Sequence, residues 1–168
     1  DVDGTQSLAI AKSWRRITRV KWAPDGSRLV ILGSPDSAPA AVYLTDKLGG
    51  SLRALRVNAT AAAFTRDSRS VTVAVGTTSQ ALERFDAATL ARLDSMPLPG
   101  PWVIRDLDYA PDRNRIIASV LSPGVAGGIL ALLGADGRVI DSLTEGGTRD
   151  PIRWSPDGSA VDTFEYAP

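Results

Sequence analysis

Short apolar runs alternate with clusters of Pro, Asp, Ser and Gly along the whole chain. The runs at 29–32, 71–75, 116–121 and 161–164 contain many β-branched residues, and each comes shortly after one of the turn clusters. Runs of this length and composition are typical of strands, whereas Pro, Asp and Gly favour tight turns. The pattern therefore predicts an all-β chain of many short strands.

One motif, in which an apolar stretch ends in an aromatic residue and a turn follows, occurs four times. The aromatic residues stand at positions 22, 64, 109 and 154, so their spacings are 42, 45 and 45 residues. A period of about 40–45 residues with several short strands is typical of β-propellers, whose blades are four-stranded antiparallel sheets. The sequence therefore predicts a single propeller domain over residues 1–168, with repeats at about 14–57, 58–99, 100–145 and 146–168.

Each residue of the motif has a structural explanation. Pro sets φ at the first turn position, Asp accepts hydrogen bonds from the nearby backbone, and Gly allows a positive φ. The aromatic residue is expected to pack between neighbouring sheets. The alternatives are an aromatic cage for a ligand and a pair of catalytic carboxylates of the glycosidase type. The residues assigned to this structural repeat are Trp22, Pro24, Asp25, Gly26, Phe64, Asp67, Tyr109, Pro111, Asp112, Trp154, Pro156, Asp157 and Gly158.

The order Trp-(Ala/Ser)-Pro-Asp-Gly before an apolar strand, at 22–26 and 154–158, resembles the repeat of PD40 or TolB-like propellers, a bacterial WD40-like family. The third repeat has Arg113 in place of Gly, and the second has Arg66 and Ser68 in place of Pro and Gly. The resemblance implies a propeller of a bacterial protein, soluble or peripheral at a membrane, with the periplasmic side favoured. It implies no particular activity, because one fold hosts many functions.

The two ends of the chain together form one repeat that lacks about one strand. Residues 3–10 resemble residues 136–143, so residues 7–10 are predicted to be the outermost strand of the last blade and to close a four-bladed ring. Two alternatives stay open: the chain is part of a longer propeller, or open arcs from two chains join. Asp1 is the first residue and Met96 the only Met, which is compatible with a cleaved leader or a missing N-terminal segment.

The composition argues against several classes of chemistry. The chain has no Cys and no His, which removes disulfides, Cys nucleophiles, His bases and His-based metal sites. Lys plus Arg and Asp plus Glu both number 19, and a formal charge of zero argues against nucleic acid as a partner. No apolar run reaches the about 18 residues of a membrane-spanning helix. We therefore predict no enzyme activity, no cofactor, no metal site and no transmembrane span.

Trp and Arg residues cluster before two of the motifs, in segments expected to be loops between blades on one face of the propeller. These residue types are enriched at protein interfaces. The alternative is that each Trp packs on its own blade. The residues assigned to partner binding are Trp14, Arg15, Arg16, Arg19, Pro99, Trp102 and Arg105.

Two acidic residues, Asp106 and Asp108, alternate along one predicted strand and therefore share a face. That face could line a central channel and hold a cation, and a solvated strand face is the alternative. The predicted function is a noncatalytic protein–protein interaction platform, an extrinsic scaffold or accessory subunit that binds other protein subunits of a larger, membrane-associated bacterial complex. One alternative is a TolB-like sensor or accessory domain of a longer kinase- or peptidase-type chain. The other is a propeller enzyme that uses the channel carboxylates and calcium.

Overall fold

The computed structural model describes residues 13–76, 80–112, 114–125, 128–143 and 149–165. Within these ranges every regular element is a strand, so the all-β prediction is confirmed. No helix in this part of the chain could cross a membrane. The strands are β1 (Trp14–Trp22), β2 (Arg28–Pro35), β3 (Ala41–Asp46), β4 (Arg53–Val57), β5 (Ala59–Phe64), β6 (Ser70–Val75), β7 (Ala81–Asp86), β8 (Arg92–Pro97), β9 (Val103–Tyr109), β10 (Arg115–Leu121), β11 (Ile129–Gly134), β12 (Val139–Leu143), β13 (Arg149–Trp154) and β14 (Val161–Glu165).

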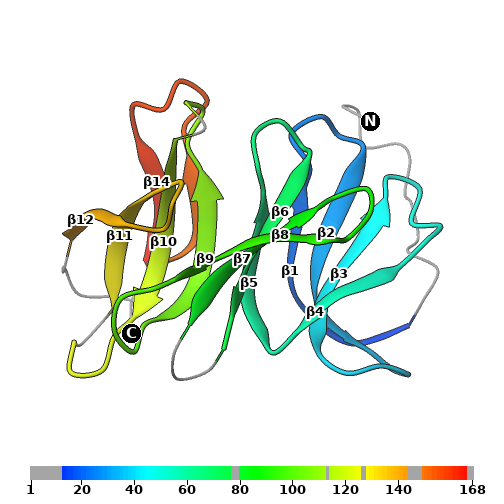
Figure 1. Cartoon of the computed structure of the whole chain (residues 1–168). Helices are drawn as coiled ribbons and strands as arrows, with labels where there is room; N and C mark the ends of the chain where they lie inside the picture. The colour runs from blue at the N-terminus through cyan, green and yellow to red at the C-terminus, as the bar shows by residue number, and fades with distance from the viewer. Residues whose placement is uncertain (1–12, 77–79, 113, 126–127, 144–148, 166–168) are drawn as a thin grey trace.

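The strands form four antiparallel sheets that follow one another in sequence order (Figure 1). β1 to β4, β5 to β8 and β9 to β12 each form a four-stranded sheet, whereas β13 and β14 form a two-stranded sheet. The first strands of consecutive sheets are neighbours, with β1 beside β5, β5 beside β9 and β9 beside β13. The arrangement is propeller-like, and the described residues show no closed ring. The expected outermost strand at residues 7–10 lies outside the described residues.

The core lies between consecutive sheets. Phe64, at the end of β5, is 4% exposed and belongs to one core cluster with Val30 of the first sheet. Tyr109, at the end of β9, is 3% exposed and shares a cluster with Leu82 of the second sheet. Its hydroxyl oxygen also lies 2.7 Å from Thr72 Oγ1 of the second sheet. Each of these motif aromatics therefore packs against the sheet that precedes its own.

Trp22 departs from the predicted packing between sheets. Its side chain is 55% exposed, and Ile17 and Val20 of the same strand are also exposed. The reason is its place in the first sheet, because no described sheet precedes β1. The last motif aromatic, Trp154, is half-buried, and the Arg115 guanidinium of the third sheet lies 5.2 Å from the centre of its ring.

The motif turn uses the same hydrogen bond in every repeat. In each, an aspartate carboxylate accepts from the backbone N–H two residues later, at 2.9 to 3.1 Å, and these carboxylates are Asp25, Asp67, Asp112 and Asp157. The residue directly after this aspartate is Gly in the first and fourth repeats. Its φ is 69° at Gly26 and 73° at Gly158, a region that Gly adopts readily. Ser68 has φ 60° in the repeat that lacks this Gly, and its hydroxyl accepts from the N–H of Asp25 at 3.1 Å.

Two equivalent aromatic positions give a matched test of this packing. We expect Phe64→Ala to lower the free energy of unfolding by about 3–5 kcal/mol, because it opens a cavity between two sheets. Trp22→Ala should lower it by about 1 kcal/mol or less, because more than half of that side chain already contacts solvent. Urea denaturation followed by circular dichroism measures both values. Equal losses would show that Trp22 is covered in solution.

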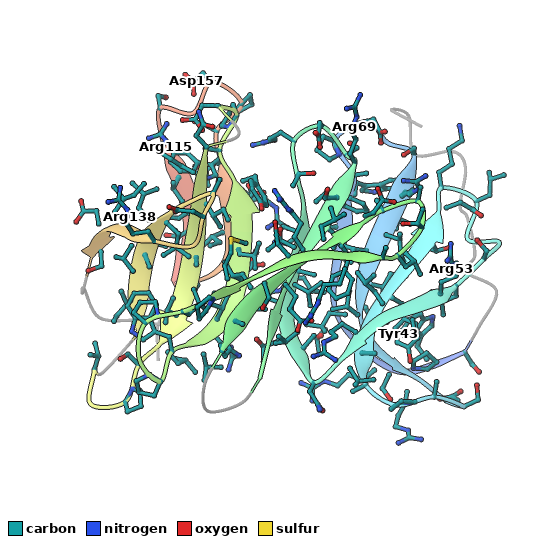
Figure 2. The ribbon with its side chains drawn as sticks, in the orientation of Figure 1. Tyr43, Arg53, Arg69, Arg115, Arg138 and Asp157 are labelled. Carbon is teal, nitrogen blue, oxygen red and sulfur yellow. The ribbon has the colours of Figure 1, made fainter. Side chains whose placement is uncertain are left out.

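Acid should weaken the turns in a defined range. The pKa of the Asp157 carboxyl is lowered from 3.8 to about 2, first because the Ser155 hydroxyl donates to it and next because the Ser159 N–H does (Figure 2). A carboxyl with a lowered folded-state pKa stabilises the fold above its unfolded pKa, and this contribution is lost as the pH falls through the folded pKa. The amide oxygen of Asp157→Asn can still accept these hydrogen bonds.

We therefore expect Asp157→Asn to have a lower urea midpoint than the unmodified chain near neutral pH. The difference should shrink as the pH falls from about 4 through the folded-state pKa of about 2, below which both side chains are uncharged. A difference that stays constant over this range would contradict the assignment.

Candidate functional site

Three first strands meet around one carboxylate, that of Asp106 on β9, which is fully buried. Lys21 Nζ of β1 lies 2.5 Å from Asp106 Oδ1. Arg153 of β13 and Arg19 of β1 place guanidinium nitrogens 3.4 and 3.5 Å from Asp106 Oδ2. The backbone N–H of Ile152 donates to the same oxygen at 3.1 Å. A buried carboxylate needs cations and donors of this kind, so the cluster ties the first, third and fourth sheets together.

Side chains also satisfy backbone groups on the edge of β9 that no strand pairs with. The Lys21 ammonium donates to the carbonyl oxygen of Leu107 at 2.5 Å. Arg66 Nε, from the turn after β5, donates to the carbonyl oxygen of Tyr109 at 2.8 Å. Buried backbone groups are costly when they lack a partner. The long cationic side chains therefore take the place of a neighbouring strand along this edge.

The contacts of Asp106 and Asp108 do not favour a bound cation. The Asp106 carboxylate contacts Lys21 and Arg153. Asp108 Oδ2 accepts from the backbone N–H of Trp154 at 2.9 Å. A metal ion would have to displace these donors. Within the described ranges, no group of three or more acidic side chains is placed to hold a metal.

Burial lowers the pKa of Lys21, and the adjacent Asp106 carboxylate partly opposes this shift.

A β-bulge interrupts β1, β5 and β9, the first strands of the three four-stranded sheets. In each strand it lies four residues before the motif aromatic. The residue left without a cross-strand partner is Thr18 in β1, Thr60 in β5 and Arg105 in β9. Bulges bend a strand and redirect its side chains, and they are common beside functional sites. The repeated bulge therefore turns three equivalent side chains toward one end of the first strands.

In β1 the bulge also sorts the side chains by chemistry. One face of β1 carries the cations Arg16, Arg19 and Lys21. They pair with Ser34, Leu32 and Val30 of β2, which alternate along that strand. The residues on the opposite face are Ile17, Val20 and Trp22. Without the inserted residue, each of these sets would be divided between the two faces of the strand.

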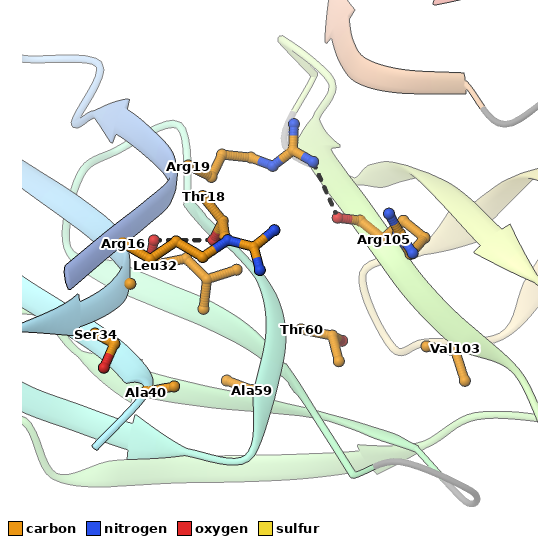
Figure 3. A pocket seen from close by; sticks show the side chains of 11 residues that line it. Arg16, Thr18, Arg19, Leu32, Ser34, Ala40, Ala59, Thr60, Val103 and Arg105 are labelled. Atoms are coloured by element: carbon orange, nitrogen blue, oxygen red, sulfur yellow. Dashed lines mark hydrogen bonds between the residues drawn. The ribbon is translucent and has the colours of Figure 1, made fainter. Parts of the chain in front are cut away.

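The three bulge residues line a cavity of about 370 Å³ where β1, β5 and β9 begin, and we call it the arginine cavity (Figure 3). Its cationic residues are Arg16, Arg19 and Arg105, and none of the described lining residues is acidic. Figure 3 shows Arg16 and Arg19 on the β1 side and Arg105 on the β9 side. The structure thus brings together three residues that the sequence assigned to partner binding.

The two Trp residues assigned to partner binding contact their own chain. Trp14 meets Tyr43 edge to face, with ring centres 5.5 Å apart, and its ring covers Gly33. Trp102 packs against the core cluster between the second and third sheets. The Trp14 contact matches the alternative in which each Trp packs on its own blade, whereas Trp102 packs on a core that two sheets share.

The segment from Trp14 to Arg19 belongs to β1, which corrects its assignment to a loop between blades. The β-branched residues Ile17, Thr18 and Val20 favour an extended chain, and β2 supplies the partner strand. Two further residues assigned to partner binding, Arg15 and Pro99, are exposed. Neither of them lines the arginine cavity.

A second cavity, of about 450 Å³, lies at the opposite ends of the first strands. Trp22, Phe64 and Trp154 are among its lining residues, together with Arg66 and Arg153. Three of the four motif aromatics therefore reach one opening. The ring of Phe64 is almost fully buried in the core, so its main role here is packing.

No protein-family model matches the chain, and no curated protein matches it. Among solved structures, 396 chains match, and one of them is the crystal structure of the eukaryotic initiation factor. That match has a TM-score of 0.55 and 17% sequence identity, and it covers 82% of this chain. This chain spans 34% of the length of that one. At this identity the likeness shows the fold alone.

The buried cluster predicts a large effect of one charge. Asp106→Asn should lower the free energy of unfolding by about 3–5 kcal/mol, because it leaves the buried Lys21 ammonium without its carboxylate. The double variant Asp106→Asn with Lys21→Met should recover part of this loss, because the unpaired cation is removed as well. Urea denaturation measures both.

Asp136→Asn is the matched control, because Asp136 is exposed and its oxygen accepts from the N–H of Arg138, as an amide oxygen can. It should change the free energy of unfolding by about 0.5 kcal/mol or less. Equal effects of the substitutions at positions 106 and 136 would show that the buried ion pair does not hold the sheets together.

Proposed function

We propose that this chain is a β-propeller of the PD40 or TolB-like type that acts as a noncatalytic platform for protein–protein interaction. It serves as an extrinsic scaffold or accessory subunit of a larger, membrane-associated bacterial complex. One observation carries the proposal: the charges between the first strands are engaged with one another, whereas Arg16 and Arg105 make no side-chain hydrogen bond or ion pair with the described residues. Exposed cations that a folded scaffold presents are suited to recognition.

The enzyme alternative has less support from the same region. It requires carboxylates that are free to bind calcium or substrate. Both oxygens of Asp106 already accept from cations of this chain, and Asp108 accepts from the backbone of β13. Catalysis would therefore have to begin by breaking contacts that hold the sheets together.

A second candidate is a propeller domain of a longer kinase- or peptidase-type chain. Among the described residues the fourth sheet has two strands where the others have four, and β1 exposes Ile17, Val20 and Trp22. Both features leave room for further sheets in a larger ring.

The test is capture of a partner by the immobilised chain from detergent-solubilised membranes of its source. We expect a defined set of proteins to bind in constant proportions to the unmodified chain. The variant Arg16→Gln with Arg105→Gln should lose this set, because it removes the two cavity arginines that have no acceptor among the described residues and leaves the buried cluster intact.

The control variant is Arg69→Gln with Arg138→Gln, which removes two exposed arginines that lie away from the arginine cavity (Figure 2). It should retain the captured set. Capture that is the same for both double variants, or the absence of any defined set, would contradict the proposed function.

A further inference from the structure

The arginine cavity concentrates positive charge, and two of its three arginines are not neutralised by any described residue. Arg19 is held beside Asp106, with one guanidinium nitrogen 3.5 Å from Oδ2 and another 3.5 Å from the carbonyl oxygen of Arg105. The side chains of Arg16 and Arg105 have no acceptor among the described residues. Since the described lining contains no acidic residue, the cavity has a positive potential that attracts anions.

The cavity wall is partly apolar and partly polar. Leu32 and Val103 contribute apolar surface to the lining. The Thr60 hydroxyl oxygen accepts from Gln80 Nε2 at 3.0 Å, so its proton is available to a ligand. The volume of about 370 Å³ lies within the range of small-ligand pockets, so it accepts side chains of a partner and excludes a folded domain.

The geometry of the cations favours a carboxylate ligand. Guanidinium groups form paired hydrogen bonds with carboxylates and phosphates. An apolar wall beside them suits the methylene groups of Glu and an adjacent apolar side chain. A nucleic acid backbone requires a track of cations along the surface, whereas this chain has zero formal charge and places these arginines around one cavity.

We propose that the arginine cavity binds the carboxylates of an acidic peptide segment of a protein partner. Arg16 and Arg105 contact the carboxylates from opposite sides, and Leu32 and Val103 contact the apolar part of the segment. The bulges at Thr18, Thr60 and Arg105 fix the cavity before the ligand arrives, which lowers the entropic cost of binding. This inference rests on the proposed function and specifies the chemistry of the partner.

The experiment is a titration of the isotope-labelled full chain, followed by two-dimensional NMR of the backbone amides. The probe is a short peptide with blocked ends in which Leu separates two Glu residues. The control peptide has Gln in place of Glu. We expect the amides of Gly33, Thr60 and Val103 to shift in a saturable manner with the Glu peptide only. Higher salt should weaken the binding.

Variants locate the site. Arg16→Gln with Arg105→Gln should weaken binding of the Glu peptide by about tenfold or more, since each lost hydrogen bond to a charged group contributes substantially. Arg69→Gln with Arg138→Gln should bind as the unmodified chain does. The amide spectrum of each variant reports whether it is folded.

Several outcomes would overturn the proposal. They are an absence of saturable shifts, equal binding of the Gln peptide, or unchanged binding by the variant at positions 16 and 105. Inorganic phosphate or a single-stranded oligonucleotide that shifts the same amides when the Glu peptide does not would assign the cavity to phosphate. The peptide titration uses purified chain, so its failure is distinct from a failure to capture a membrane partner.

Discussion

The constraint on which this structure depends is the unpaired edge of its first strands. Consecutive sheets bring β1, β5, β9 and β13 together side by side, and no further described strand pairs with these edges. Their backbone groups still need partners because they are partly removed from water. Lys21 and Arg66 donate to carbonyls of β9, Gln80 accepts from its Ile104 N–H, and Asp106 accepts from β13.

This constraint separates structural charges from free charges along a single strand. On one face of β1, Lys21 and Arg19 are drawn toward the buried Asp106, while Arg16 extends toward the arginine cavity without an acceptor from the described residues. The bulge at Thr18 is what places all three cations on the same face. Cations that pair with Asp106 and a cation without an acceptor among the described residues therefore occupy neighbouring positions of the same strand.

The two ends of the row of sheets explain why equivalent residues have different surroundings. Phe64 and Tyr109 occupy the same position in their repeats as Trp22, and both are buried because a sheet precedes their own. Trp22 holds the equivalent place in its repeat, but no described sheet precedes β1. Repeat proteins distribute their stability over contacts between adjacent units, so a unit without a neighbour exposes a face that the others cover.

The sequence by itself determined the strands, the turns and the all-β class, because these depend on local chemistry. The Asp carboxylate that accepts from an N–H two residues later, and the Gly with positive φ, act within a few residues and can be recognised in the motif. Only the tertiary structure decided which charges are buried and which are free. Lys21 and Asp106 are 85 residues apart, and a bulge such as that at Thr18 has no distinct residue type, so alternation along the strand did not reveal that Arg16 and Arg19 share a face. The exposure of Trp22 among the described residues depends on which sheet lies beside β1, and no local pattern encodes that.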